Sequence, residues 1–268
     1  MAEIKNSTEV IEETAALEQI ARPSALQPGT APAAETLQSS DDNKRALVVA
    51  AHPDDAEFGC AGTAFLWSQD GWEFHYLICT DGSKGTDDPE MTPDKLVPLR
   101  REEQRAAAKV LGVKSVNFLD YVDGTLTYNS EFLRDVVRYI RLIKPRAVFT
   151  HDPTQVIRNS FINHPDHRCT GTVTIDAVYP MARNRPSFPE LLTEGLDSFK
   201  VKELYLWASE NINFEVDITE AIDVKFAALR KHASQFHNFE EMEARFRQRF
   251  SEPDGRFLEK FRRIEMQF

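Results

Sequence analysis

Short apolar runs that alternate with amphipathic segments constrain the fold of this chain most strongly. From Lys44 onward, five such runs follow one another: RALVVAAH, EFHYLICT, SVNFLD, AVFTHD and ELYLWAS. Helix-like stretches lie between them, among them LRREEQRAAAKVLG and SEFLRDVVRYIRLIKP. This alternation predicts a parallel sheet with crossover helices. The continuous apolar character of LVVAA predicts a strand that is buried on both faces.

The 268 residues fit one α/β domain with extensions, and we expect a Rossmann-like three-layer α/β/α sandwich with a mostly parallel sheet. Residues 1–44 contain no aromatic side chain and end in a stretch rich in Ala, Pro, Ser and Thr. Such a segment buries too little apolar surface to offset its ordering entropy. We therefore expect a largely disordered extension over residues 1–44, in which STEVIEETAALEQIA could form a short helix, and one domain over residues 45–268.

The C-terminal segment carries an aromatic stripe. Phe239, Phe246 and Phe250 recur at helical intervals in FEEMEARFRQRFSEPDGRFLEKFRRIEMQF. The spacing predicts C-terminal amphipathic helices that pack on the core. A subunit interface or a membrane-surface contact is the alternative, and the sequence leaves a homo-oligomer open.

Net charge and cysteine spacing limit the kinds of binding partner and metal site that we expect. With 32 basic and 43 acidic residues, the net charge of -11 argues against nucleic acid. The three cysteines have no CxxC spacing, which argues against a disulfide framework and against a sulfur-based zinc site. The first residues have no signal-peptide pattern, and no apolar run approaches the roughly 20 residues of a membrane span. We expect a cytoplasmic protein without an integral membrane segment.

Two His-Pro-Asp tripeptides stand where chemistry is expected. In open α/β sheets, ligands bind beyond the carboxyl ends of strands. AHPDDAEFG follows the first apolar run directly, and NHPDHR comes shortly after AVFTHD. Histidine and carboxylate groups are suitable ligands for a divalent metal. His164 and His167 are three residues apart and so share one side of a helical turn.

A structural alternative exists for the first tripeptide alone, namely a strand-end turn whose Asp caps the next helix. Two such tripeptides after two buried strands favour a metal site instead. Adjacent Asp54 and Asp55 point in different directions, so that one can bind a metal while the other faces the metal-bound water. Three protein ligands with a free fourth position are typical of catalytic zinc. Amide hydrolysis also needs a base and an oxyanion stabiliser, for which a spare Asp and a spare His are present.

The chain resembles the LmbE-like, or PIG-L, family of zinc deacetylases. The motifs AHPDDAEFGCAGT, CTDGSKGT, LRREEQRAAAKVLGV, FLDYVDGTL and NHPDHRCTG carry this resemblance, which covers roughly residues 45–237. It implies a Zn²⁺ cofactor, with Fe²⁺ as an alternative, held by His52, Asp55 and His167. The sequence departs from many relatives at Ala56, where they have Glu. It also departs at Ile162, where some sugar deacetylases have Tyr.

The same resemblance implies roles for five further residues. Asp54 would be the general base, and His164 a protonated partner for the oxyanion or the leaving amine, with Asp166 orienting its ring. Arg100 matches a position that contacts the sugar, and Asp123 one near the substrate hydroxyls. Neighbouring Arg101 could be confused with Arg100.

The expected reaction is therefore removal of an N-acetyl group from an N-acetylglucosamine-type small molecule or its conjugate. An amidase that cleaves a larger acyl group with the same residues is one alternative. A non-catalytic metal-binding member of the family is a second, and a glycosyltransferase that uses the paired aspartates is a third. The presence of both Asp54 and His164 argues against the second, and the His-rich NHPDHR argues against the third.

Overall fold

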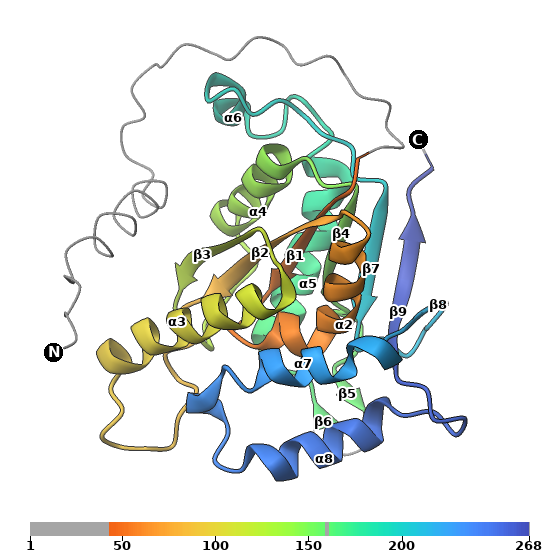
Figure 1. Ribbon diagram of the computed structural model, residues 1–268. Coiled ribbons are helices and arrows are strands. Elements are labelled where there is room, and N and C mark those ends of the chain that lie inside the picture. The colour runs from red at the N-terminus through yellow and green to blue at the C-terminus, as the bar shows by residue number, and fades with distance from the viewer. Residues whose placement is uncertain (1–42, 159–160, 268) are drawn as a thin grey trace, which may run out of the picture. The chain divides into compact units, whose positions relative to one another are not determined.

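The computed structural model describes residues 43–158 and 161–267. The predicted extension over residues 1–44, with its short helix, lies outside these residues except for residues 43 and 44. A seven-stranded sheet forms the centre of the described chain, in the order β3-β2-β1-β4-β7-β9-β8 (Figure 1). Its strands are β1 (Arg45–Ala50), β2 (Glu73–Thr80), β3 (Ser115–Tyr121), β4 (Ala147–His151), β7 (Glu203–Trp207), β8 (Phe214–Asp217) and β9 (Leu258–Glu265).

The first five strands along this order are parallel, and β9 and β8 are antiparallel additions at one edge. The five apolar runs of the sequence are these five parallel strands, so the predicted α/β fold with a mostly parallel sheet is confirmed. A short antiparallel hairpin of β5 (Ile157–Arg158) and β6 (Phe161–Ile162) stands apart from the sheet.

Helices cover both faces of the sheet. Successive side chains of β1 point to opposite faces and so contribute to a different part of the core on each face. Leu47 and Val49 pack in one cluster with residues of α4 (Ser130–Ile143) and α5 (Pro165–Asp176). Ala46 and Val48 pack in another with residues of α2 (Asp55–Gln69) and α3 (Pro93–Leu111). Since successive side chains of a strand point to opposite faces, β1 is buried on both, as its apolar sequence predicts.

The remaining helical segments are short. They are η1 (Ala177–Met181), α6 (Pro189–Thr193), η2 (Thr219–Ala221), α7 (Ile222–Leu229), η3 (Ala233–Gln235) and α8 (Phe239–Phe250). Helix α3 has Gly112 as its C-cap, with a φ of 75°. Among the described helices, none combines the length and the apolar character needed to cross a membrane.

The C-terminal segment differs from its prediction. Helix α8 does pack its aromatic stripe on the core, with Phe246 against Phe58 and Phe239 buried. Residues 258–265, however, form strand β9 instead of a further helix. The buried charge of Glu259 obscures the strand pattern. Its carboxylate accepts hydrogen bonds from the backbone N–H groups of Gly62 (2.9 Å) and Thr63 (2.8 Å) and pairs with the buried Lys225 ammonium.

Candidate metal centre and active site

Strand order brings the two His-Pro-Asp segments to one edge of the sheet. Strands β1 and β4 are parallel neighbours, with Ala46 opposite Ala147, so their carboxyl ends lie side by side. The first segment leads from β1 directly into α2, and the second leads into α5. Both helices therefore begin at the edge where ligands bind in folds of this kind.

Donor atoms of the three predicted metal ligands lie close together. His52 Nδ1 is 3.2 Å from Asp55 Oδ2 and 3.2 Å from His167 Nε2, and His167 Nε2 is 3.1 Å from Asp55 Oδ1. Tetrahedral zinc with bonds of about 2.0–2.2 Å places adjacent donors roughly 3.3 Å apart. The donor types and their spacing therefore fit a zinc-like ion. His164 can complete a set with His52 and His167, and His151 a set with Asp55 and His167.

Charge around His52 also favours a cation at this place. Its Nε2 lies 3.2 Å from Asp123 Oδ1 and 3.3 Å from Asp166 Oδ2. Burial alone would lower the pKa of His52, but contacts with Asp123, Asp166 and Asp55 outweigh it and raise the pKa to about 12. The buried carboxylates thus hold a proton on the ring of the metal-free chain, as expected of a site with excess negative charge.

Asp54 has an unusual backbone conformation. Its φ of 92° is left-handed, and its side chain makes no capping hydrogen bond to α2. Its N–H donates to Gln104 Oε1 (2.9 Å), and its Oδ2 accepts from Arg100 Nη2 (3.2 Å). Burial raises the pKa of Asp54 to about 6, against the opposing charge of Arg100. A carboxylate whose pKa approaches neutrality suits proton transfer.

Arg100 is buried between two loops. Its guanidinium donates to the carbonyl oxygens of Pro53 (2.7 Å) and Gly82 (3.0 Å) as well as to Asp54. A Cβ added at Gly82 would lie 2.7 Å from this guanidinium, and one at Gly85 would lie 2.5 Å from it. The TDGSKGT loop therefore needs glycine to close around Arg100. Arg101 faces elsewhere and pairs with Asp120, so that the two arginines are distinguished.

The second segment forms a regular helix start. His164 is the N-cap of α5, and its Nδ1 accepts the N–H of Asp166 at 3.2 Å. Burial, followed by the charge of His52, lowers the pKa of His164. In this hydrogen bond Nδ1 carries no proton, so the proton of a neutral ring lies on Nε2. The role of His164 as a protonated partner stays a prediction.

Asp166 has other partners than expected. Its carboxylate accepts the N–H groups of Gly124 (2.6 Å) and Leu126 (3.2 Å) and contacts His52, whereas its contact with His164 is through the backbone. Asp123, expected near substrate hydroxyls, contacts the same nitrogen of His52 and accepts the N–H of Lys84 at 3.1 Å. In this structure both carboxylates orient His52.

His151 also belongs to this cluster. Its ring stacks on His167 with centroids 4.2 Å apart, and its Nε2 lies 3.5 Å from Asp55 Oδ2. The indole N–H of Trp207 donates to its Nδ1 at 3.1 Å. Burial lowers the pKa of His151 to about 4. Its position at the end of β4, beside the end of β1, was the signal for this placement.

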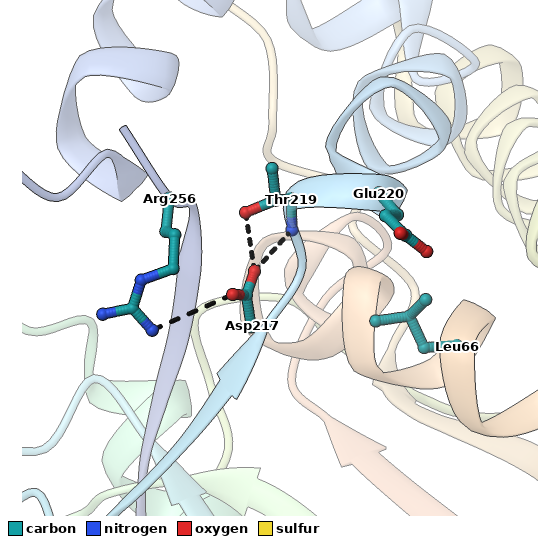
Figure 2. Close-up of a pocket in the computed structure, with 5 residues that line it drawn as sticks. All are labelled: Leu66, Asp217, Thr219, Glu220 and Arg256. Atoms are coloured by element: carbon teal, nitrogen blue, oxygen red, sulfur yellow. Dashed lines mark hydrogen bonds and ion pairs between the residues drawn. The ribbon is translucent and has the colours of Figure 1, made fainter. Parts of the chain in front are cut away.

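A separate surface pocket lies away from this centre (Figure 2). It is lined by Leu66, Asp217, Thr219, Glu220 and Arg256. Its polar groups bind one another, since Thr219 donates twice to Asp217 and Arg256 lies 3.8 Å from the same carboxylate. None of the predicted site residues lines it.

Comparisons with known proteins agree with this geometry. Residues 47–178 match the PIG-L family, described as GlcNAc-PI de-N-acetylase. A diacetylchitobiose deacetylase of Thermococcus kodakarensis is 36% identical over 73% of this chain and 72% of its own length. A probable N-acetyl-alpha-D-glucosaminyl L-malate deacetylase 2 of Bacillus anthracis is 26% identical over 73% and 83%.

The fold has a solved counterpart as well. The structure of N,N'-diacetylchitobiose deacetylase from Pyrococcus horikoshii superposes with a TM-score of 0.76 and 29% identity, over 99% of this chain and 95% of that one. Sequence, fold and the cluster at the strand ends lead to one conclusion: the chain belongs to the PIG-L, or LmbE-like, family.

Proposed function

We propose that this protein is a metal-dependent N-deacetylase that removes the acetyl group from an N-acetylglucosamine-type sugar or its conjugate. One observation carries the proposal: the nearest donor atoms of His52, Asp55 and His167 lie 3.1–3.2 Å apart, beside the partly exposed carboxylate of Asp54. The relatives named as deacetylases of diacetylchitobiose and of N-acetylglucosaminyl malate support the substrate class.

His52, Asp55 and His167 would hold the metal, for which we propose Zn²⁺, with Fe²⁺ as the alternative. When bound, such an ion polarises a carbonyl group and lowers the pKa of water to about 7. Asp54 would accept the proton of the attacking water and return it to the nitrogen of the leaving amine as the C–N bond breaks. Because Arg100 holds Oδ2 of Asp54, the other carboxylate oxygen is the one we assign to this transfer.

His164 would stabilise the oxyanion through a hydrogen bond. Its Nδ1 accepts the N–H of Asp166, which leaves Nε2–H as the donor toward the substrate oxygen. Asp166 and Asp123 would keep His52 oriented as a ligand. Direct contact of Arg100 or Asp123 with the sugar stays a prediction, since their present contacts hold Asp54 and His52.

The test is acetate release from N-acetylglucosamine, diacetylchitobiose and N-acetylglucosaminyl malate. Zinc-loaded, iron(II)-loaded and chelator-treated protein would be compared, with His75→Gln as a matched histidine control whose ring contacts Ser115 in mid-sheet. We expect acetate only from metal-loaded protein, and no effect of the control. Metal-loaded protein that releases no acetate from any of these sugars would contradict the proposal. Release of larger acyl groups alone would favour an amidase.

A small-molecule substrate needs no macromolecular partner, and we propose none. The three free cysteines, Cys60, Cys79 and Cys169, are compatible with a reducing cytoplasm, which stays a prediction.

A further inference from the structure

A buried hydrogen-bonded chain runs behind Asp54 and ends at a histidine outside the metal centre. Gln104 Oε1 accepts the N–H of Asp54 (2.9 Å), and Gln104 Nε2 donates to Glu57 Oε1 (2.8 Å). The other carboxylate oxygen of Glu57 lies 3.2 Å from His232 Nε2. Gln104, Glu57 and His232 each have 0% of their surface exposed. These hydrogen-bonded side chains thus connect α3, α2 and the segment after α7, and none of the three is exposed to solvent.

Each link of this chain has a direction. The ionised carboxylate of Glu57 can only accept, so it takes an N–H of the Gln104 amide and turns the amide oxygen toward Asp54. His232 must then donate from Nε2. Removal of His232 would leave one oxygen of Glu57 buried without its partner, which is costly for a charged group.

Asp54 needs such support because of its backbone. A φ of 92° is unfavourable for a residue with a Cβ and persists only where surrounding contacts determine it. Two contacts do so here: Gln104 holds the backbone N–H, and Arg100 holds the carboxylate. The first depends on the orientation of an amide that could rotate, and Glu57 sets that orientation.

The segment that carries His232 is itself fixed to the site. Ser234 donates to Glu103 from its N–H (2.7 Å) and its Oγ (2.6 Å). The Gln235 side chain lies against the TDGSKGT loop, where its Oε1 would be 2.7 Å from a Cβ at Gly85. Helix α3 therefore binds this segment at Glu103 and binds Asp54 at Gln104, one residue further along.

We propose that His232 is a positioning residue for Asp54, acting through Glu57 and Gln104. The inference rests on the proposed function in taking Asp54 as the base. Burial alone would lower the pKa of His232, but the hydrogen bond and charge of Glu57 outweigh it and raise the pKa. This shift agrees with a His232 that donates to a carboxylate.

Kinetics of three variants test the proposal. His232→Leu removes the donor and should lower kcat by about 10–100-fold, the usual effect of losing an orienting partner. KM and bound zinc should stay within about twofold. His232→Gln can still donate to Glu57 and should recover most of kcat. His237→Leu is the control, because the exposed His237 lies in the same segment but is not one of the hydrogen-bonded residues Gln104, Glu57 and His232. In an Asp54→Asn background, His232→Leu should cause no further loss.

A second measurement is independent of activity. NMR-detected hydrogen exchange of the Asp54 amide should be at least about tenfold faster in His232→Leu than in wild type, and unchanged in His237→Leu. If His232→Leu does not fold, Glu57→Gln gives the same test. Unchanged exchange would overturn the positioning role even if the wild type were active. A wild type without deacetylase activity but with accelerated exchange in His232→Leu would overturn the proposed function alone.

Discussion

The two His-Pro-Asp segments share three residues and differ in almost everything that the fold does with them. In the first, His52 points into the metal centre and Asp54 has a left-handed backbone. In the second, His164 caps α5 and Asp166 is a regular helical residue. Both segments bring their fourth residue, Asp55 or His167, to the same place, 3.1 Å apart. A shared motif therefore predicts where each segment lies in the fold. The residues packed against the segment determine which contacts its side chains make.

The source of the difference lies in what packs behind each segment. Asp54 is at the N-cap position of α2, but its side chain contacts Arg100 and its N–H binds Gln104, and the side chain makes no capping hydrogen bond. Asp166 instead meets two free backbone N–H groups, those of Gly124 and Leu126. The Asp54 carboxylate thereby contacts Arg100, whereas the Asp166 carboxylate contacts His52.

Replacing the fourth residue of either segment, Asp55 or His167, should have the largest effect on metal binding and acetate release. His167→Ala and Asp55→Ala should each lose bound metal and at least about 10³-fold in acetate release, because a Lewis acid contributes several kcal/mol and each 1.4 kcal/mol is tenfold. Metal content by elemental analysis and acetate release would be measured together. His164→Ala is the comparison and should keep its metal. Equal loss of metal in His164→Ala would mean that the ligand set is assigned wrongly.

Asp166→Asn should have an intermediate effect on metal binding. It removes a charge that lies 3.3 Å from His52 Nε2, and loss of such a partner typically lowers metal affinity by about 10–100-fold. Competition with a zinc chelator would measure the affinity. An Asp166→Asn protein with wild-type affinity would show that Asp123 alone orients His52.

Paired glycine and alanine substitutions should show the backbone difference between the segments. At Asp54, the glycine variant should be more stable than the alanine variant by about 1 kcal/mol, because glycine tolerates a positive φ. At Asp166, the order should reverse by roughly 0.5–1 kcal/mol, because glycine weakens a helix. Urea unfolding of the four variants gives both differences. The same order at both positions would refute the left-handed Asp54.

His52 and His164, the first residues of the two segments, should make opposite contributions to the pH dependence of stability in the metal-free protein. The pKa of His52 is raised to about 12, so its contribution to stability is full below the unfolded value of about 6.5 and is lost as pH rises toward 12. The pKa of His164 is lowered, so its contribution is present above about 6.5 and is lost as pH falls. Denaturant unfolding of chelator-treated wild type, His52→Gln and His164→Gln as a function of pH would measure the two contributions to stability separately. Similar pH profiles of the two variants would contradict the opposite shifts.

Much of this could be predicted from the sequence because it depends on patterns local to the chain. The apolar runs predicted the parallel strands, and the repeated tripeptide predicted that His52, Asp55, His164 and His167 would lie near one another. His151 and Asp123, which belong to the same cluster, lie outside the tripeptides. Strand β9 could not be predicted, since its buried Glu259 is stabilised by Lys225 and α2, which are remote in sequence.

Partner choice within the site could not be predicted for the same reason. Asp166 lies two residues from His164, yet its carboxylate contacts His52, 114 positions away. Arg100 carries a charge that suits a ligand, but its hydrogen bonds go to two loops that only the fold brings together. Sequence spacing identifies such residues without specifying which atoms they meet.

The most direct measurement of the central claim is acetate release by Asp54→Asn and wild type at equal zinc content. We expect the variant to bind zinc as wild type does and to lose about 10²–10⁴-fold in kcat, the usual contribution of a general base. A variant that kept its zinc and wild-type kcat would contradict the assignment of Asp54. It would show that the conformation of this segment serves the fold and not the reaction.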